Sequence, residues 1–503
     1  MPERYNHCDS NAKVLRPERC VALNGHPCVA CIEDIELEKE MNQGEGSIDS
    51  KIQKRRALRT TMNENHDRLI HRFPPEIAFE IFIQYGASFD KRGDSRSHPL
   101  YLGAVCQKWR QLAWATPELW TSLHIASSPL QVNESLPQLV AQWLERSAAL
   151  PLTIDFEFIV CHLVQHPADK IYPEVINHLN HHSERWREVH LKLPARHLNR
   201  LCGSFQGNIL RTLVLSGIYD EPSNTSGLAF FGMKSKPSPT HLTLDSFRLI
   251  SVDIAWNFIT VASLKTIPVD ECFEFLRRCP VLESLTLTSV YFYRAGVTFP
   301  MPQTRISCLH LHSLELSMID ESVLSNILDS ICLPALRRWV HFHCPVPWDK
   351  MLSLAKHSSL KEFRMSGGPD AYPDVPNFLH QLSSLEVLQL RFWFSSRKPP
   401  ASELLDRLCT PASGSSPFLP HLQYLEFALS FPLSWESIPQ LFASPNRQSL
   451  KIKVDYESHR GPQNLTDEAA ERLLEMVGKG YDLTILRNGQ DLIQELREKL
   501  RRT

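Results

Sequence analysis

The 503-residue chain contains no run of about eighteen apolar residues, so nothing in it predicts a membrane span. Its first residues, Met1 to His7, include no apolar stretch of the kind that a secretory signal needs. The 54 lysines and arginines are matched by 56 aspartates and glutamates, and the formal net charge of −2 gives no electrostatic footprint for nucleic acid. These absences predict a protein of the cytoplasm, the nucleus or both, with neither a membrane nor a nucleic acid as partner.

Sequence motifs that carry catalysis are also missing. The chain has no Gly-rich phosphate loop, no Gly-x-Ser-x-Gly turn and no His-Glu-x-x-His pair. His341, His343 and Cys344 could touch a metal ion, but polar residues at a strand end explain them more simply. We therefore expect a binding protein that is not an enzyme and uses no cofactor. A hydrolase or transferase in the C-terminal half would need a pocket with converging polar groups.

Thirteen cysteines in a long chain without a visible signal favour reduced thiols, most of them buried as small apolar groups. Four of them, Cys8, Cys20, Cys28 and Cys31, lie within residues 1–31. Cys28-x-x-Cys31 has the spacing of half a zinc site, but eleven residues separate Cys8 from Cys20, which does not fit the other half. We interpret residues 1–31 as a mobile tail with unliganded thiols; a zinc site made by these four cysteines is the weaker alternative.

Residues 32–70 are charged and helix-prone. Apolar residues recur loosely from Ile32 to Met62, with Gly44 and Gly46 between them, and this break predicts two helical pieces in place of one coiled coil. The basic cluster from Lys51 to Arg56 could be a nuclear signal, but a solvated helix face is the simpler reading.

Residues 71–125 predict a small unit of short helices. Two prolines can open the first helix, and a glutamate follows where the helix dipole favours a carboxylate. Three large apolar residues behind them are predicted to share one helix face, followed by a polar loop from Gly86 to His98. A core this small often needs a partner to complete it, so the pattern indicates a docking module. The two prolines are Pro74 and Pro75, the glutamate is Glu76, and the three apolar residues are Ile77, Ile81 and Phe82.

The order of these residues carries a resemblance to a known family. Phe73-Pro74-Pro75-Glu76-Ile77, Ile81-Phe82, Val105-Cys106 and Trp109-Arg110 resemble the F-box of basidiomycete F-box-like proteins, which usually have leucine where this chain has Phe73. The likeness extends over residues 32–160, through Leu144-Glu145-Arg146-Ser147 and Leu150-Pro151-Leu152-Thr153-Ile154.

This resemblance implies a small helical unit that docks onto a Skp-type adaptor of a cullin-based ubiquitin ligase, while the rest of the chain selects the protein to be ubiquitinated. The first anchors are expected to be Pro74, Pro75, Ile77, Ile81 and Phe82. Val105, Cys106 and Trp109 are expected either to complete the contact or to hold the helices together, and Trp109 is expected to serve the core more than the contact. The adaptor-binding residues that the resemblance implies are Phe73, Pro74, Pro75, Glu76, Ile77, Ile81, Phe82, Val105, Cys106 and Trp109.

A Leu-x-x-Leu-x-Leu-like unit recurs through the rest of the chain. Its starts at Leu311, Leu336, Leu360 and Leu385 lie 25, 24 and 25 residues apart, within the range of leucine-rich repeats. The last two apolar positions of a unit alternate, so they point the same way from a short strand. Further copies include Trp186-Val189-Leu191, Leu210-Leu213-Leu215, Leu264-Ile267-Val269 and Leu422-Leu425-Phe427.

Amphipathic segments such as Glu271 to Cys279 and Glu321 to Ile331 separate the units and predict helices. Stacking of such units buries a continuous core, so residues 126–464 are predicted to form an α/β solenoid, an irregular leucine-rich-repeat horseshoe, capped by residues 465–503. A small all-α F-box at 71–125 and a helical or disordered N-terminal region precede it.

The predicted function is a substrate-recognition subunit of an SCF-type cullin-RING ubiquitin ligase with an unknown target protein. Target binding is expected on the residues between the buried leucines, with Arg364, Arg391 and Trp393 as weak candidates, although Trp393 could also pack between repeats. The alternative is a leucine-rich-repeat interaction scaffold that takes no part in ubiquitination.

Overall fold

The computed structural model of the chain describes residues 28–43, 47–66, 73–90, 99–127, 134–158, 168–217, 230–293, 298–367, 375–392, 400–409, 418–429, 435–442, 447–456 and 465–502. The chain divides into two units, which we describe separately. The first comprises Met1–His124, Val132–Ile154 and Lys170–His178, and the second Ile125–Gln131, Asp155–Asp169 and Leu179–Thr503. Within the described ranges, no helix has both the length and the apolar character to cross a bilayer.

The first unit begins with two packed helices, α2 (Val29–Asn42) and α3 (Ile48–His66), as the break near Gly44 predicts. Arg55 of α3 donates from Nε to the buried carboxylate of Asp34, 3.2 Å away, and also pairs with Glu38 at 3.2 Å. Arg55 therefore holds the helix pair together, so the basic cluster is not wholly the solvated face that its sequence predicts.

Helices α5 (Pro75–Asp90), α6 (Pro99–Val105) and α7 (Gln107–Trp114) follow, with the 3-10 turn η2 (Pro117–Trp120). Helix α5 continues through Gly86 to Asp90, so the predicted start of a loop at Gly86 is wrong. One glycine costs about 1 kcal/mol within a helix, which is too little to end it. A Cβ at Gly86 would lie 3.6 Å from the side chain of Leu119, an ordinary van der Waals distance, so the packing of η2 against α5 does not require a glycine there.

A tryptophan cluster joins α7 and η2 to helix α8 (Leu136–Arg146). Trp120 is fully buried, donates from Nε1 to the carbonyl of Ala113 at 2.8 Å, and meets Trp143 edge to face at 4.8 Å. The guanidinium of Arg146 lies over the rings of Trp114 and Trp120, 4.1 and 4.6 Å from their centroids. Burial lowers the pKa of Arg146, and the ring faces offer partial compensation for its lost hydration.

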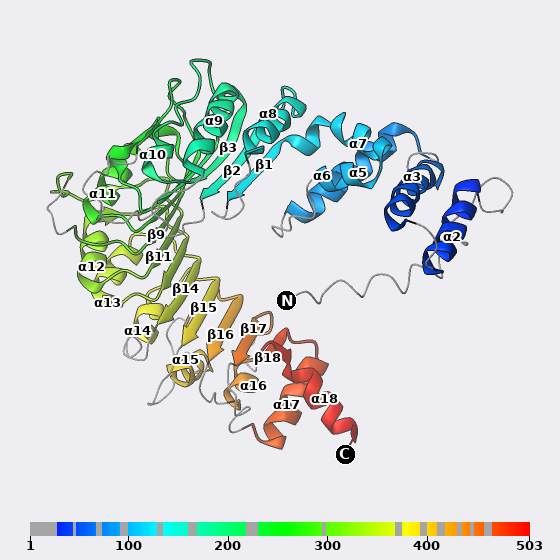
Figure 1. Ribbon diagram of the computed structural model, residues 1–503. Helices are drawn as coiled ribbons and strands as arrows, with labels where there is room; N and C mark the ends of the chain where they lie inside the picture. Colours follow the sequence, from blue (N-terminus) through cyan, green and yellow to red (C-terminus); the bar gives the residue numbers. More distant parts are fainter. Residues whose placement is uncertain are drawn as a thin grey trace. The chain divides into compact units, whose positions relative to one another are not determined.

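The second unit is organised around a long parallel sheet (Figure 1). The sheet order is β1-β2-β3-β4-β6-β8-β9-β11-β13-β14-β15-β16-β17-β18-β19, so consecutive main strands lie side by side. Successive strands from β3 to β18 pair in parallel, and β19 (Gln490–Asp491) pairs antiparallel with β18. The main strands are β1 (Ser122–Ser127), β2 (Leu152–Phe158), β3 (Trp186–Lys192), β4 (Thr212–Ser216), β6 (His241–Asp245), β8 (Val261–Lys265), β9 (Ser284–Thr288), β11 (Ser313–Ser317), β13 (Arg338–Phe342), β14 (Glu362–Gly367), β15 (Val387–Phe392), β16 (Tyr424–Leu429), β17 (Lys451–Tyr456) and β18 (Leu483–Arg487).

Helices between the strands lie along one face of this sheet (Figure 1). Their positions agree with the amphipathic segments of the sequence. The chain is thus a mixed α/β protein whose second unit resembles a leucine-rich-repeat solenoid. The helices between the strands are α9 (Ala168–His181), α10 (Ala195–Leu198), α11 (Val269–Arg278), α12 (Glu321–Ser330), α13 (Trp348–Ala355), α14 (Val375–His380), α15 (Pro400–Cys409), α16 (Ser437–Phe442) and α17 (Asp467–Gly478), and α18 (Leu492–Arg502) follows the last strand.

The parallel register stacks the buried residue of each strand on that of the next. Leu213 pairs with Leu242, which pairs with Ala262, and Ala262 pairs with Leu285. The predicted repeat at Leu264-Ile267-Val269 is therefore wrong, because the strand buries Ala262 and Leu264. Because Ala262 occupies a position that holds leucine in other repeats, the sequence pattern did not show that Ala262 and Leu264 are the buried residues of this strand.

Backbone hydrogen bonds fix both ends of the strands in the middle of the sheet. Before the strands, one carbonyl accepts two N–H groups of the next repeat, as the carbonyl of Arg211 does from Thr240 and His241, both at 2.9 Å. After the strands, a residue with positive φ donates to the neighbouring strand; the N–H of Thr266, φ 53°, lies 2.9 Å from the Thr288 carbonyl. Five consecutive repeats place non-glycine residues in this conformation: Ser246, Thr266, Ser289, Met318 and His343.

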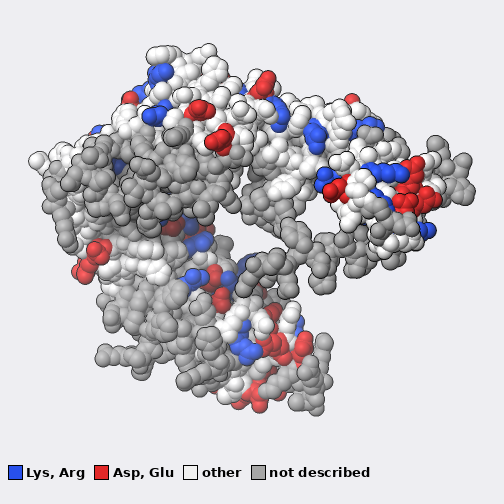
Figure 2. All heavy atoms as spheres, viewed as in Figure 1, with Lys and Arg blue, Asp and Glu red and all other residues white. Residues whose placement is uncertain are grey.

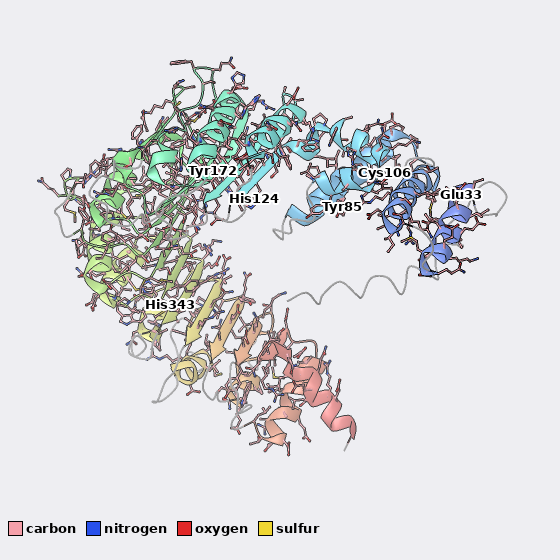
Figure 3. All side chains as sticks on the ribbon, viewed as in Figure 1. Glu33, Tyr85, Cys106, His124, Tyr172 and His343 are labelled. Carbon is pink, nitrogen blue, oxygen red and sulfur yellow. The ribbon has the colours of Figure 1, made fainter. Side chains whose placement is uncertain are left out.

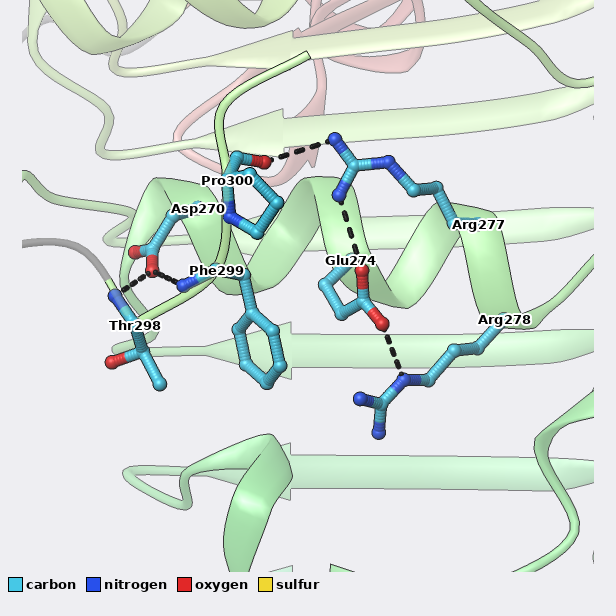
Figure 4. A network of polar contacts seen from close by, with 7 residues as sticks. All are labelled: Asp270, Glu274, Arg277, Arg278, Thr298, Phe299 and Pro300. Carbon is cyan, nitrogen blue, oxygen red and sulfur yellow. Dashed lines mark hydrogen bonds and ion pairs between the residues drawn. The ribbon is translucent and has the colours of Figure 1, made fainter.

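Two carboxylates of α11, those of Asp270 and Glu274, accept hydrogen bonds from residues 298–299 and from the end of the helix (Figure 4). Asp270, which is 1% exposed, accepts the N–H groups of Thr298 and Phe299 at 2.6 and 2.9 Å. Glu274 accepts from Arg277 and Arg278, and although its partial burial acts in the opposite direction, these arginines lower its pKa. Near the helix N-terminus, the dipole also favours the buried charge of Asp270.

His341 occupies a core position of β13 that other repeats give to an apolar residue. It pairs in the register with Leu316 on one side and Met365 on the other, and its side chain is fully buried. Its Nε2 lies 3.0 Å from the Pro345 carbonyl, which requires the ring to donate there. Burial lowers the pKa of His341 to about 4, so the ring is neutral at pH 7.

Because the unfolded chain binds this proton more readily than the folded one, the second unit should lose stability as the pH falls from 6.5 toward 4. Between pH 6.5 and 4, the titration of His341 should change the free energy of unfolding by up to about 1.4 kcal/mol per pH unit. We expect His341→Leu to remove this pH dependence. Urea unfolding of the second unit at several pH values measures the difference between wild type and variant. His343→Leu, at an exposed neighbour, serves as the control. A difference that stays constant from pH 7 to pH 4.5 would contradict the assignment.

Candidate functional site

The candidate site lies on α5, α6 and α7 of the first unit. The N–H of Ile77 bonds to the carbonyl of Pro74 at 3.1 Å, so the helix begins at the two prolines as predicted. Ile77 and Ile81 lie four residues apart, which places them on one side of α5, and Phe73 lies just before the helix begins. The exposed fractions of Phe73, Ile77 and Ile81 are 47%, 46% and 41%, and Pro74, Pro75 and Glu76 are exposed beside them.

Phe82 lies on the other side of α5 and is 1% exposed. The prediction that it shares a face with Ile77 and Ile81 is wrong, because a one-residue step turns about 100° around a helix. Phe82 packs with Leu102 and Ala113, and its ring centroid lies 4.8 Å from that of Trp109. It is a core residue, and it is not available as an adaptor anchor in this fold.

Val105 and Cys106 end α6 and begin α7 with opposite roles. Val105 is 48% exposed, whereas Cys106, which is labelled in Figure 3, is buried. The Sγ of Cys106 accepts the N–H of Trp109 at 3.5 Å and so caps the N-terminus of α7. Of the two roles expected for Cys106, the structure supports the one that holds the helices together, and Cys106 is not part of an exposed contact surface. Trp109 is partly buried against the core, which agrees with its expected role.

Among the described residues of α6 and α7, two exposed aromatic residues were not among the predicted site residues. Tyr101 on α6 is 53% exposed and precedes Val105 by four residues, so both lie on one side of their helix. Trp114 at the end of α7 is 43% exposed. A hydrophobic pattern shows that such residues belong to a helix, but it does not show which side the small core leaves uncovered.

A pocket of about 520 Å³ adjoins these residues. Its lining includes Thr60 of α3 together with Val105, Arg110 and Trp114. Arg110 is held there by a hydrogen bond from its Nε to the Gly103 carbonyl at 2.9 Å. We define the apolar surface of the first unit by Phe73, Ile77, Ile81, Tyr101, Val105 and Trp114.

The predicted target-binding residues lie on the second unit. Arg364 of β14 is partly exposed and pairs with Glu362, and Arg391 of β15 is exposed. Trp393 lies outside the described residues. The same sheet face, which is opposite the helices and which we call the front face, also carries Gln389 and Tyr424, both hydrogen-bonded to Glu426 at 2.8 and 2.9 Å.

The proposed zinc ligands are described only in part. Cys31 is buried on α2 and Cys28 is half-buried just before it, while Cys8 and Cys20 lie outside the described residues. Within the part of the chain that the structure describes, no three His, Cys, Asp or Glu side chains form a group that could hold a metal ion.

Comparisons with known proteins give a distant structural neighbour. An LRR protein of Leptospira interrogans aligns with 13% sequence identity and a TM-score of 0.30, over 74% of this chain and 91% of the other. No protein-family model matches the chain. No curated protein matches it either.

Because neighbouring residues of α5 face opposite ways, Phe82→Ala and Ile81→Ala should differ sharply in effect. Phe82→Ala should destabilise the α5–α7 core by about 3–5 kcal/mol, whereas Ile81→Ala should cost less than about 1 kcal/mol. Hydrogen exchange of α5–α7 amides in the full chain measures both. Equal loss of protection in the two variants would contradict the assignment of faces.

Proposed function

We propose that the chain is a substrate receptor of a cullin-based ubiquitin ligase. In this proposal the apolar surface of the first unit binds a Skp-type adaptor, and the front face of the second unit binds a target protein. The ligase partners would supply catalysis, and this chain would contribute proximity by holding the target near them.

The exposure of large apolar side chains on a small helical unit is the observation that carries the proposal. Six such residues fall between positions 73 and 114, and each is at least 41% exposed. The core beneath them is small, with Phe82, Leu102 and Ala113 as its buried members. Apolar residues that recur at one side of two helices, over so small a core, favour a partner that covers them.

The resemblance of the motif supports an adaptor as that partner. Phe73, Pro74, Pro75, Glu76 and Ile77 occur in the order typical of an F-box, and the structure exposes all five. The aromatic and aliphatic side chains on this surface can provide the desolvated centre of an interface, with Glu76 at its polar edge.

Replacing both isoleucines of α5 by aspartate should abolish adaptor binding, because two charges would enter the centre of an apolar contact. We expect Ile77→Asp with Ile81→Asp to weaken binding of a purified Skp-type adaptor by at least about 100-fold. The measurement is a titration of full-length protein with the adaptor, followed by co-purification.

A matched control removes exposed apolar residues elsewhere. Phe205 and Ile209 are 84% and 47% exposed in the second unit. The double variant Phe205→Asp with Ile209→Asp therefore tests whether the adaptor binds nonspecifically to exposed apolar residues. The control should bind the adaptor as wild type does. If wild type does not bind, or if both double variants bind equally, the adaptor proposal is lost, and an interaction scaffold outside ubiquitination becomes the better account.

A further inference from the structure

Three arginines form a diagonal line across adjacent strands of the front face. Arg338 of β13 is opposite Glu362, Arg364 of β14 is opposite Val340 and Gln389, and Arg391 of β15 is opposite Ser366. Each step moves one strand across and two residues along. With strands ~4.8 Å apart and a rise of ~3.3 Å per residue, the attachment points of consecutive arginines lie about 8 Å apart.

A carboxylate holds two of these arginines in place. Glu362 Oε1 accepts from Nε of Arg338 at 3.1 Å and also from Nε of Arg364. Arg338 donates from Nη1 to the hydroxyl of Ser313 at 3.2 Å as well. A guanidinium has five N–H donors, so these contacts orient the two groups and leave most donors for a ligand. The front positions of β13 to β15 hold three arginines and one glutamate, a formal balance of 3 − 1 = +2 within these strands, and Glu315 and Glu426 lie on the strands to either side.

The three arginines lie together in one part of the front face. The central front-face positions of β6, β8 and β9 carry the short uncharged residues Thr243, Ser263 and Thr286, while Lys265 and Asp245 at the strand ends pair with each other at 2.9 Å. In Figure 2, basic and acidic side chains lie intermixed over the part of the sheet that Figure 1 labels β14 to β18. A partner that binds across β13 to β15 therefore meets arginines on three successive strands, whereas the flanking strands β11 and β16 carry Glu315 and Glu426 on this face.

We propose that Arg338, Arg364 and Arg391 bind an extended acidic segment of a partner protein, with an anionic side chain at every second residue. This inference deepens the proposed function, since it rests on the front face as the target-binding surface. Side chains two residues apart on an extended chain lie ~6.6–6.8 Å apart on the same side, close to the spacing of the arginines. Arginine is suited to this role because its planar group binds carboxylate and phosphate oxygens through two N–H groups.

The local charge pattern favours a peptide over a nucleic acid. A nucleic-acid site needs a run of cations along a phosphate backbone, often interleaved with aromatic rings for stacking. Here Glu362 lies between two of the arginines and Glu426 lies on the next strand, so carboxylates interrupt any run of cations on this face. Equally tight binding of a single-stranded oligonucleotide would overturn the peptide assignment.

The test uses full-length protein and fluorescein-labelled nine-residue peptides in a fluorescence anisotropy titration. One peptide alternates serine with glutamate, one replaces each glutamate by glutamine, and one carries phosphoserine at the glutamate positions. The glutamate peptide should bind at least about tenfold more tightly than the glutamine peptide. Tighter binding of the phosphoserine peptide would assign a phosphorylated partner, and weaker binding a carboxylate-rich one.

The double variant Arg338→Gln with Arg364→Gln should lose this preference. A matched control, Lys350→Gln with Lys479→Gln, removes the same charge from α13 and from the end of α17, where these lysines pair with Asp329 and Glu475. The control should bind as wild type does. No preference for glutamate in wild type, or equal weakening in both double variants, would overturn the proposal.

Adaptor binding is measured on the same samples. The arginine variant should bind the adaptor normally and unfold at the wild-type temperature, which shows that the loss is local. If the adaptor fails to bind any sample while the glutamate peptide binds, the ligase role fails and the acidic-segment site stands. If the adaptor binds and the peptides do not, the acidic-segment site fails and the ligase role stands.

Discussion

Helix α5 can turn only one side toward a core that three short helices build, and this constraint creates the surface on which the proposed function depends. Ala78 and Phe82 fill the core side, and they leave Ile77 and Ile81 outside. Since α6 and α7 are only seven and eight residues long, they cannot wrap the remaining apolar side chains. A larger domain would bury such residues, whereas this unit exposes them and so favours a partner.

The second unit solves a different packing problem. A strand in a parallel stack buries alternate residues against the helices, so the residues between them are free of packing constraints and can vary. Across β13 to β15 this variation produced three arginines on a diagonal line, with Glu362 holding two of them. The same stack also tolerated His341 at a leucine position, with its ring bonded to a backbone carbonyl.

The sequence predicts most of the architecture because periodic patterns report burial. Alternating leucines predict the strands, and amphipathic segments such as Glu321 to Ile331 predict the helices between them, close to α12 as found. The pattern misled where a buried position holds an unusual residue, as Ala262 does in β8. It also could not separate Ile81 from Phe82, since both are apolar and only the tertiary contacts of α5 decide which one is covered.

The candidate site was predictable as a stretch of chain but not as a surface. The prolyl start of α5 and its exposed isoleucines follow from local sequence, whereas the capping role of Cys106 depends on the break between α6 and α7. Arg364 and Arg391 could be named from the repeat phase, but their alignment with Arg338 requires the register of three strands. Sequence spacing alone does not contain that register, because the connecting loops differ in length.

Hydrogen exchange of the full-length chain, with and without a purified Skp-type adaptor, tests the central claim most directly. The account predicts new protection in peptides that cover residues 73–82 and 99–114, with unchanged exchange in the strands β13 to β17. Unchanged exchange over α5, α6 and α7 at saturating adaptor would contradict it.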